Sequence, residues 1–181
     1  LFWLLRLRLQ QHQESERRFS TLVDNLPGAA YCCENDRNWT MRYISRAAVA
    51  LTGYEPMALI GNAQVAYAEL IHPEDRQSVW DQIQQALGAE RSFQIEYRLR
   101  RRDGTLVWIW EQGRAVPDKA CKGRLVLEGL MLDVTERKQA EAAARETLER
   151  LESLGDNLPG GAIYRIHLAS NGLCRFTYVS K

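Results

Sequence analysis

Apolar and polar residues alternate strictly over residues 93–99, where Phe, Ile, Tyr and Leu occupy every second position. This period of two is typical of a strand with one buried face. Shorter apolar segments predict four more strands, with turns at the polar segment 35–38 and at Asp103-Gly104. The strands predicted in this way cover residues 30–34, 40–45, 93–99, 106–116 and 123–133.

Helical segments account for most of the remaining chain. Residues 5–26 contain neither proline nor glycine and predict a helix that ends at Pro27. A second long helix is predicted after Pro73, with Glu74 and Asp75 in its first turn. Three short helices are predicted over residues 46–52, 56–60 and 66–70. Two strands, several helices and three further strands predict an α+β fold, an antiparallel sheet with its helices on one face.

A five-residue motif occurs twice. The sequence Asp-Asn-Leu-Pro-Gly at 24–28 returns at 156–160, and Tyr-Ile-Ser-Arg at 43–46 has a near match, Tyr-Val-Ser-Lys, at 178–181. Two matches in the same order predict one complete domain and the start of a second copy, in a fragment of a longer protein. The four predicted parts are a signalling helix at 1–18, the complete domain at 19–135, a linker helix at 136–155 and a truncated second domain at 156–181.

The composition is that of a globular protein and excludes several classes. Hydrophobic residues make up 45% and charged residues 26% of the 181 residues, which argues against a disordered chain. Lys and Arg number 24 against 23 Asp and Glu, so no basic surplus favours a nucleic-acid partner. The 4 cysteines show neither paired metal spacing nor the density of a disulfide scaffold. We therefore expect reduced thiols, no metal site and no nucleic acid.

The first residues resemble the boundary of a membrane span. Leu1–Leu5 is strongly apolar, and Arg6 and Arg8 follow at once, as at the cytoplasmic end of a transmembrane helix. One interpretation is a membrane anchor upstream of Leu1, and the other is a helix whose apolar residues pack on a partner helix. Because the charges follow the apolar residues, a cleaved signal peptide is not expected.

The two helices that flank the complete domain share one spacing. Their seam positions lie alternately four and three residues apart, the spacing of a coiled coil. The positions are Leu5, Leu9, His12, Glu16, Phe19, Val23 and Leu26 in the first helix, and Glu141, Ala144, Leu148, Leu151, Gly155 and Leu158 in the second. The pattern predicts a homodimer held by the terminal helices. The alternative is an amphipathic helix packed on its own domain.

Six short motifs stand in a fixed order along the chain. They are DNLPG at 24–28, YIS at 43–45 leading to LTGY at 51–54, IHPEDR at 71–76, YRLRRRDG at 97–104, WI at 108–109 and GLMLDVTERK at 129–138. In this order they resemble the PAS sensor family, in the subgroup that ends in the PAC motif. The resemblance implies a five-stranded antiparallel sheet whose helices cup a small pocket, in a module that senses and dimerises and is not a catalyst. Ser45 departs from the family, which more often has asparagine at this strand end.

Aromatic residues of the predicted strands supply a candidate ligand pocket. These residues are Tyr31, Tyr43, Phe93, Tyr97, Trp108 and Trp110. The same residues equally form a packed core, and the sequence leaves both interpretations open.

The end of the last predicted strand is a candidate signal-coupling site. Asp133 can cap the outgoing helix, and Glu136 stands three residues later, as a reciprocal cap requires. The resemblance implies that Asp133 and Thr135 couple the sheet to that helix.

Two further clusters have structural interpretations. Cys32 and Cys33 are neighbours on a predicted strand, so their side chains point to opposite faces, and packing is favoured over a redox pair. Arg98 and the run 100–102 predict a solvated hairpin end. A lipid headgroup or an acidic partner is the alternative for these arginines.

Catalytic and cofactor signatures are not found along the sequence. The 3 histidines are isolated, and His72, the one candidate haem ligand by position, belongs to a turn before a helix. The segment 171–176 resembles the core of flavin-binding light sensors, but the repeat places Cys174 on a strand and not on the required helix. We therefore predict no enzymatic activity, cofactor or metal in this fragment.

The sequence as a whole predicts a sensory module of a bacterial signal-transduction protein at the cytoplasmic face of the plasma membrane. It would relay a signal, such as binding of a small molecule, through dimeric helical linkers to an output domain beyond Lys181. By family resemblance the output is a histidine kinase, as in two-component systems, and the alternative is a diguanylate cyclase. A different class of protein, a ligand-free module that only sets the geometry of a dimer, also stays open.

Overall fold

The computed structural model describes residues 14, 23, 27–118, 121, 123–156, 164–168 and 174–179. The chain forms two compact units, Leu1–Thr135 and Glu136–Lys181. Most of the helix predicted over residues 5–26 and the apolar start of the chain lie outside the described residues, as does the repeated motif at 156–160 beyond its first residue.

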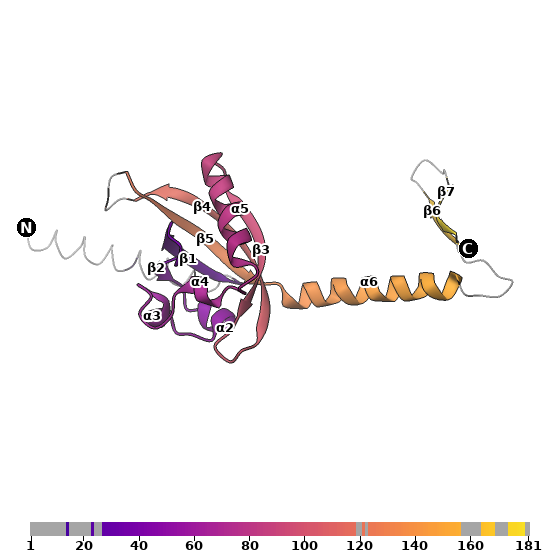
Figure 1. The fold of residues 1–181 in the computed structure, drawn as a ribbon, viewed down its shortest axis with the longest axis horizontal. Coiled ribbons are helices and arrows are strands. Elements are labelled where there is room, and N and C mark those ends of the chain that lie inside the picture. The colour runs from indigo at the N-terminus through magenta and orange to yellow at the C-terminus, as the bar shows by residue number, and fades with distance from the viewer. Residues whose placement is uncertain are drawn as a thin grey trace, which may run out of the picture. The chain divides into compact units, whose positions relative to one another are not determined.

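Five strands of the first unit form an antiparallel sheet in the order β2-β1-β5-β4-β3. The first strand therefore lies between the second and the last, and the last three strands in sequence follow one another as a meander (Figure 1). The strands are β1 (Ala29–Glu34), β2 (Met41–Ile44), β3 (Phe93–Arg100), β4 (Leu106–Pro117) and β5 (Leu125–Asp133). All five predicted strands are confirmed.

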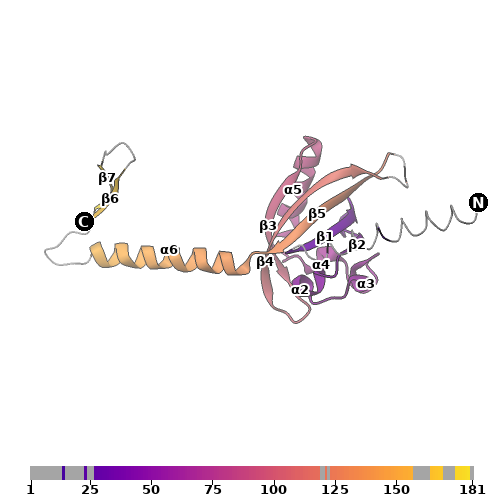
Figure 2. The same ribbon diagram turned by 180° about the vertical axis from the view of Figure 1, so that it is seen from behind.

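Four helices connect β2 to β3 and cover one face of the sheet. Their bounds are α2 (Ala48–Thr52), α3 (Pro56–Leu59), α4 (Tyr67–Leu70) and α5 (Arg76–Gly88). Gly53 ends α2 in the left-handed conformation, at φ 75°, and Pro56 begins α3, where its missing N–H costs no hydrogen bond. Figures 1 and 2 show α5 alongside β3 from both sides. The α+β fold predicted from the element order is confirmed.

The core lies between this helical layer and the sheet. The inward residues of β3 (Phe93, Ile95, Tyr97 and Leu99) are at most 4% exposed, in phase with the alternation seen in the sequence. From the opposite side, α5 contributes Val79 and Ile83. In β1, Cys33 is buried while Cys32 is partly exposed, as expected for neighbours on a strand.

Ser45 closes the end of the β1–β2 pair. Its Oγ accepts a hydrogen bond of 3.1 Å from the Ala30 N–H, and its own N–H donates to the Ala30 carbonyl at 2.8 Å. Ser45 is 2% exposed, and the hydrogen bond that it accepts is partly buried. Serine therefore makes the strand-end hydrogen bond although the family more often has asparagine here.

Replacement of Ser45 by alanine should lower the free energy of unfolding by about 1 kcal/mol, because the partly buried Ala30 N–H loses its acceptor. Urea denaturation of the two proteins measures the difference. Ser78→Ala, which removes a hydroxyl that accepts an exposed hydrogen bond on α5, is the matched control and should change stability little. Equal losses in both variants would contradict the assignment.

The second unit contains a helix and a hairpin. Helix α6 (Thr135–Asp156) carries exposed ion pairs one turn apart, such as Arg150 with Glu146 at 3.0 Å. Strands β6 (Tyr164–Leu168) and β7 (Cys174–Val179) pair antiparallel. Within the described ranges, the structure contains no helix whose length and apolar content would let it cross a bilayer.

Candidate functional site

A carboxylate lies inside the core of the first unit. Glu111 is an inward-facing residue of β4, in phase with the buried Val107 and Ile109, and it is only 6% exposed. Each of its oxygens accepts a hydrogen bond from a tyrosine: Oε1 from the Tyr31 hydroxyl, and Oε2 from the Tyr97 hydroxyl at 2.7 Å. These bonds replace the water that the carboxylate loses on burial.

A third tyrosine extends this network. The Tyr67 hydroxyl, from α4, lies 2.8 Å from the Tyr97 hydroxyl and 2.9 Å from Met131 Sδ. Strands β1, β3 and β4 and helix α4 thus converge on one buried group. We call Tyr31, Tyr67, Tyr97 and Glu111 the tyrosine–glutamate cluster.

Burial controls the protonation of this cluster. Burial raises the pKa of Glu111 above its ordinary value, and the hydrogen bonds from Tyr31 and Tyr97 offset only part of that rise. Burial, and after it the charge of Glu111, raises the pKa of all three tyrosines well above 10. The tyrosines therefore remain hydrogen-bond donors at neutral pH, while Glu111 is the group whose charge can change.

Stability should depend on pH through Glu111. Because the pKa of Glu111 is raised in the folded protein, its contribution to stability is full below the ordinary value of 4.5 and is lost as pH rises through the folded pKa. Glu111→Gln does not titrate. The free energy of unfolding of the wild type, minus that of the variant, should therefore fall as pH rises from about 4.5. Urea titrations across this range measure it, and a difference that is constant with pH would contradict the assignment.

A small interior cavity adjoins Glu111. The volume open to the centre of a water molecule is about 10 Å³, the room that one water needs. The cavity lies between the sheet and helices α4 and α5, and none of the lining residues in the described ranges is basic. The lining residues are Tyr31, Cys33, Trp39, Met41, Tyr67, Ile71, Val79, Ile83, Glu111, Leu127 and Met131.

A pair of glycines lets Tyr31 reach Glu111. Across the sheet, Tyr31 lies opposite Gly129, Gly129 opposite Gly113, and Gly113 opposite Phe93. A Cβ atom at Gly129 would lie 2.8 Å from the Tyr31 hydroxyl oxygen, and one at Gly113 would lie at the same distance. The Tyr31 side chain therefore crosses a strip of sheet that has no side chains of its own.

Trp39 forms the wall of the cavity toward α5. Its ring centroid lies 5.1 Å from that of Trp80, and the Arg37 guanidinium lies 4.1 Å from the Trp80 centroid. Trp39 has a φ of 50°, which is strained for a large side chain and costs about 1 to 3 kcal/mol. Asp36 holds this turn, because its carboxylate accepts hydrogen bonds from the main-chain N–H of both Asn38 and Thr40.

The residues predicted for a pocket fall on both faces of the sheet. Tyr31 lines the cavity, Tyr97 is buried beside it in the tyrosine–glutamate cluster, and Phe93 is buried over Gly113. Tyr43 is 40% exposed, and Trp108 and Trp110 alternate with the inward residues of β4 and so face the other way. Aromatic character alone does not distinguish the two faces.

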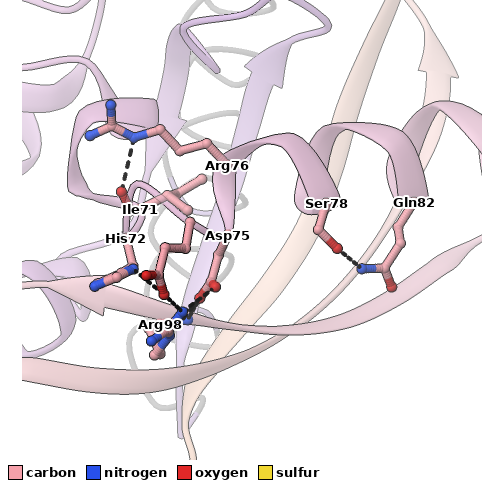
Figure 3. A network of polar contacts seen from close by, with 8 residues as sticks. Ile71, His72, Asp75, Arg76, Ser78, Gln82 and Arg98 are labelled. Atoms are coloured by element: carbon pink, nitrogen blue, oxygen red, sulfur yellow. Dashed lines mark hydrogen bonds and ion pairs between the residues drawn. The ribbon is translucent and has the colours of Figure 1, made fainter.

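The two acidic residues that follow His72-Pro73 form a structural clamp with Arg98 of β3 (Figure 3). Glu74 and Asp75 precede α5, which begins at Arg76, so the prediction that they lie in its first turn is wrong. Asp75 Oδ1 lies 2.6 Å and Glu74 Oε2 2.9 Å from Nη2 of Arg98 on β3. Hydrogen bonds from Arg98 hold the pKa of Asp75 below its ordinary value. The predicted solvated hairpin end therefore includes an arginine with two carboxylate partners.

The junction after β5 is tied to β4. Asp133 Oδ1 accepts a hydrogen bond of 2.8 Å from the Thr135 N–H, and Thr135 Oγ1 accepts one of 2.9 Å from the Trp108 N–H. Arg101, whose role the sequence did not indicate, donates to Asp133 Oδ2 at 2.8 Å and to the Leu51 carbonyl at 3.2 Å. The structure thus shows the Asp133 half of the predicted cap, and the reciprocal role of Glu136 stays a prediction.

Comparison with known proteins finds relatives among sensors. The family described as PAS fold matches residues 41–126. An uncharacterized protein of Sinorhizobium fredii is 31% identical over 130 residues, which are 71% of this chain and 15% of that protein. The blue-light-activated histidine kinase of Brucella anthropi is 34% identical over 74 residues, which are 41% of this chain and 14% of that protein. The chain therefore spans only a small part of these curated relatives.

A solved structure supports the same assignment. The sensory box histidine kinase/response regulator from Burkholderia thailandensis matches with a TM-score of 0.58 at 29% identity, over 75% of this chain and 98% of that one. The residues that match the PAS fold family, 41–126, form most of the five-stranded sheet and the helical layer described above. The domain that contains residues 41–126 is therefore a PAS domain.

Proposed function

We propose that this domain senses a small molecule in its interior cavity and relays binding through β4 and β5 to the helix that follows. The register of the two strands carries the proposal. Glu111 and Met131, which both line the cavity, lie opposite each other, and two positions along the same strands Ile109 lies opposite Asp133. A group that enters the cavity therefore contacts β4 and β5 two residues away from the Asp133 cap.

The hydrogen bonds between β4 and the residues after β5 are suited to relay a shift of the strands to α6. The Val134 N–H donates to the Trp108 carbonyl at 2.9 Å, and the Trp108 N–H donates to Thr135. A shift of β4 against β5 would change both bonds and with them the start of α6. Arg101 adds a bond from the same junction to the carboxyl end of α2.

The parent protein is proposed to be a bacterial two-component sensor. Similarity to histidine kinases supports a kinase output domain outside this chain, with the present region as a non-catalytic input module. The seam positions support dimers through the helices predicted from the sequence at 1–18 and 136–155, ahead of a second sensor domain. The apolar segment Leu1–Leu5 before Arg6 supports a place beside the inner face of the plasma membrane.

Amide hydrogen exchange of α6 tests the relay. A compound that raises the melting temperature and shifts the methyl resonances of Met41 and Met131 should change exchange at the start of α6. Thr135→Val should keep the methyl shifts and lose the change in exchange, while Thr147→Val, an exposed threonine further along α6, should keep both. An unchanged α6 with the cavity filled would overturn the relay.

The small volume of the cavity supports a second candidate function, a ligand-free module that only sets dimer geometry. In that case no compound would shift the Met41 and Met131 methyl resonances. The protein would still form a stable dimer in sedimentation experiments, and a monomer without ligands would contradict this candidate.

A further inference from the structure

The described residues that line the cavity include an acidic side chain and no basic one. Glu111 is an acid, and among the described residues that line the cavity there is neither lysine, arginine nor histidine. An anion placed there would meet a carboxylate and no compensating charge, at a site that water does not screen. The lining therefore excludes anions and leaves cations and neutral hydrogen-bond donors.

Aromatic rings complete the environment that cations prefer. Tyr31, Trp39 and Tyr67 all line the cavity, and ring faces attract ammonium groups by the cation–π interaction. The carboxylate of Glu111 accepts one tyrosine hydrogen bond on each oxygen, whereas a carboxylate has about four acceptor positions. Unused acceptor capacity and aromatic side chains thus meet in one small cavity.

Size restricts the occupant. Room for one water molecule also admits an ammonium ion, which is of similar size and donates four hydrogen bonds. Met41 and Met131 line the same space, and methionine side chains adjust readily to an added methyl group. Neither a nucleotide nor a flavin would fit without unfolding this core.

We propose that the cavity of this domain binds a small protonated amine, with ammonium and methylammonium as its smallest members. The proposal rests on the proposed ligand-sensing function and names its ligand class. The ammonium group lies against Glu111, and any methyl group points toward Met41 and Met131. Methylammonium is the probe because its methyl group distinguishes the added compound from ammonium ions already in the solution.

The bound cation should favour the ionised form of Glu111. Facing this carboxylate are Tyr31 and Cys33 from β1, Tyr67 from α4 and Tyr97 from β3, and burial raises the pKa of each of these groups. They stay neutral near pH 7, so among these groups Glu111 is the one whose protonation competes with binding of the cation. Affinity for methylammonium should therefore rise with pH through the pKa of Glu111.

The first experiment needs no variant. Methylammonium chloride is titrated into the wild-type protein against sodium chloride at equal ionic strength, with the methyl resonances of Met41 and Met131 as the readout. We expect saturable shifts with methylammonium, weaker ones with methanol and none with formate. If sodium chloride causes the same shifts as methylammonium chloride, the shifts reflect ionic strength and not binding of the amine. That result would overturn the proposal.

Glu111→Gln tests the role of the carboxylate. Loss of one charge-assisted contact should weaken methylammonium binding about tenfold or more, and the pH dependence should disappear. Glu128→Gln, which alters an exposed carboxylate of β5, should bind as the wild type does. Binding of methylammonium that is equal in both variants would overturn the proposal.

The outcomes separate this inference from the proposed function. If methanol binds as well as methylammonium, or formate binds better, the cavity senses ligands but not cations, and only the inference fails. If no compound shifts either methyl resonance, ligand sensing in this cavity fails as well.

Discussion

Replacement of Gly129 by alanine is expected to destabilise the domain by about 3 kcal/mol. The new methyl group would lie 2.8 Å from Cε1 and from the hydroxyl oxygen of Tyr31, and closer still to the main-chain carbonyl of Gln112. The carbonyl belongs to the strand paired with β5, and Tyr31 cannot turn away without losing its hydrogen bond to Glu111. Urea denaturation monitored by circular dichroism measures the loss.

Gly88→Ala is the matched control for this substitution. A Cβ atom at Gly88, the last residue of α5, meets nothing within 4 Å. Alanine there should leave stability unchanged or raise it by about 0.5 kcal/mol, since alanine favours helices more than glycine does. A Gly129→Ala protein as stable as Gly88→Ala would contradict the close approach of Tyr31 to the sheet.

Asp75→Ala is expected to cost about 2 kcal/mol, because it breaks the clamp between the segment that precedes α5 and strand β3. Asp75 accepts hydrogen bonds from the Arg98 main-chain N–H at 2.9 Å and from its side chain at 2.6 and 3.0 Å. The Arg98 side chain keeps 30% exposure, so water partly solvates it after the loss and the cost stays below that of a fully buried pair. Thermal and urea unfolding both measure the change.

Acid should reduce this difference. The pKa of Asp75 is lowered in the folded protein, so its stabilising contribution is full above the ordinary value of 3.8 and is lost as pH falls through the folded pKa. The control is Glu146→Ala, which breaks an exposed ion pair with Arg150 and should cost less than about 0.5 kcal/mol. A loss for Asp75→Ala no larger than that of this control would show that the clamp contributes little.

Local patterns predicted the elements of the fold because each element has one dominant face. The alternation over 93–99 corresponds to β3, and the segment 30–34 differs from β1 by a single residue at its start. The start of α5 was misplaced because Glu74 and Asp75 favour a first helical turn in isolation, whereas in the fold their carboxylates bind Arg98 on a distant strand. A partner so remote in sequence leaves no local pattern.

The tyrosine–glutamate cluster and its cavity were harder to predict from the sequence than the helices and strands. Glu111 stands in phase with Val107 and Ile109, and a charged residue at an inward position could have marked it. The hydrogen-bond partners of Glu111 come from two other strands, and only the folded chain brings Tyr31 of β1 and Tyr97 of β3 to its two oxygens. The pocket role proposed for aromatic residues depended on which face each occupies, and for Trp108 and Trp110 the phase of β4 decides that.

The position of β1 between β2 and β5 has a consequence for synthesis of the chain. Ala29 pairs with Met131 and Glu34 with Val126, so the sheet closes through contacts of high contact order. On the ribosome, β1 and β2 emerge long before β5, and a two-stranded hairpin alone is marginally stable. A nascent chain that stops before Leu125 exposes the open edge of β1, with its unpaired main-chain groups, to other chains. Completion of the last strand therefore decides both when this domain folds and how long it is prone to aggregate.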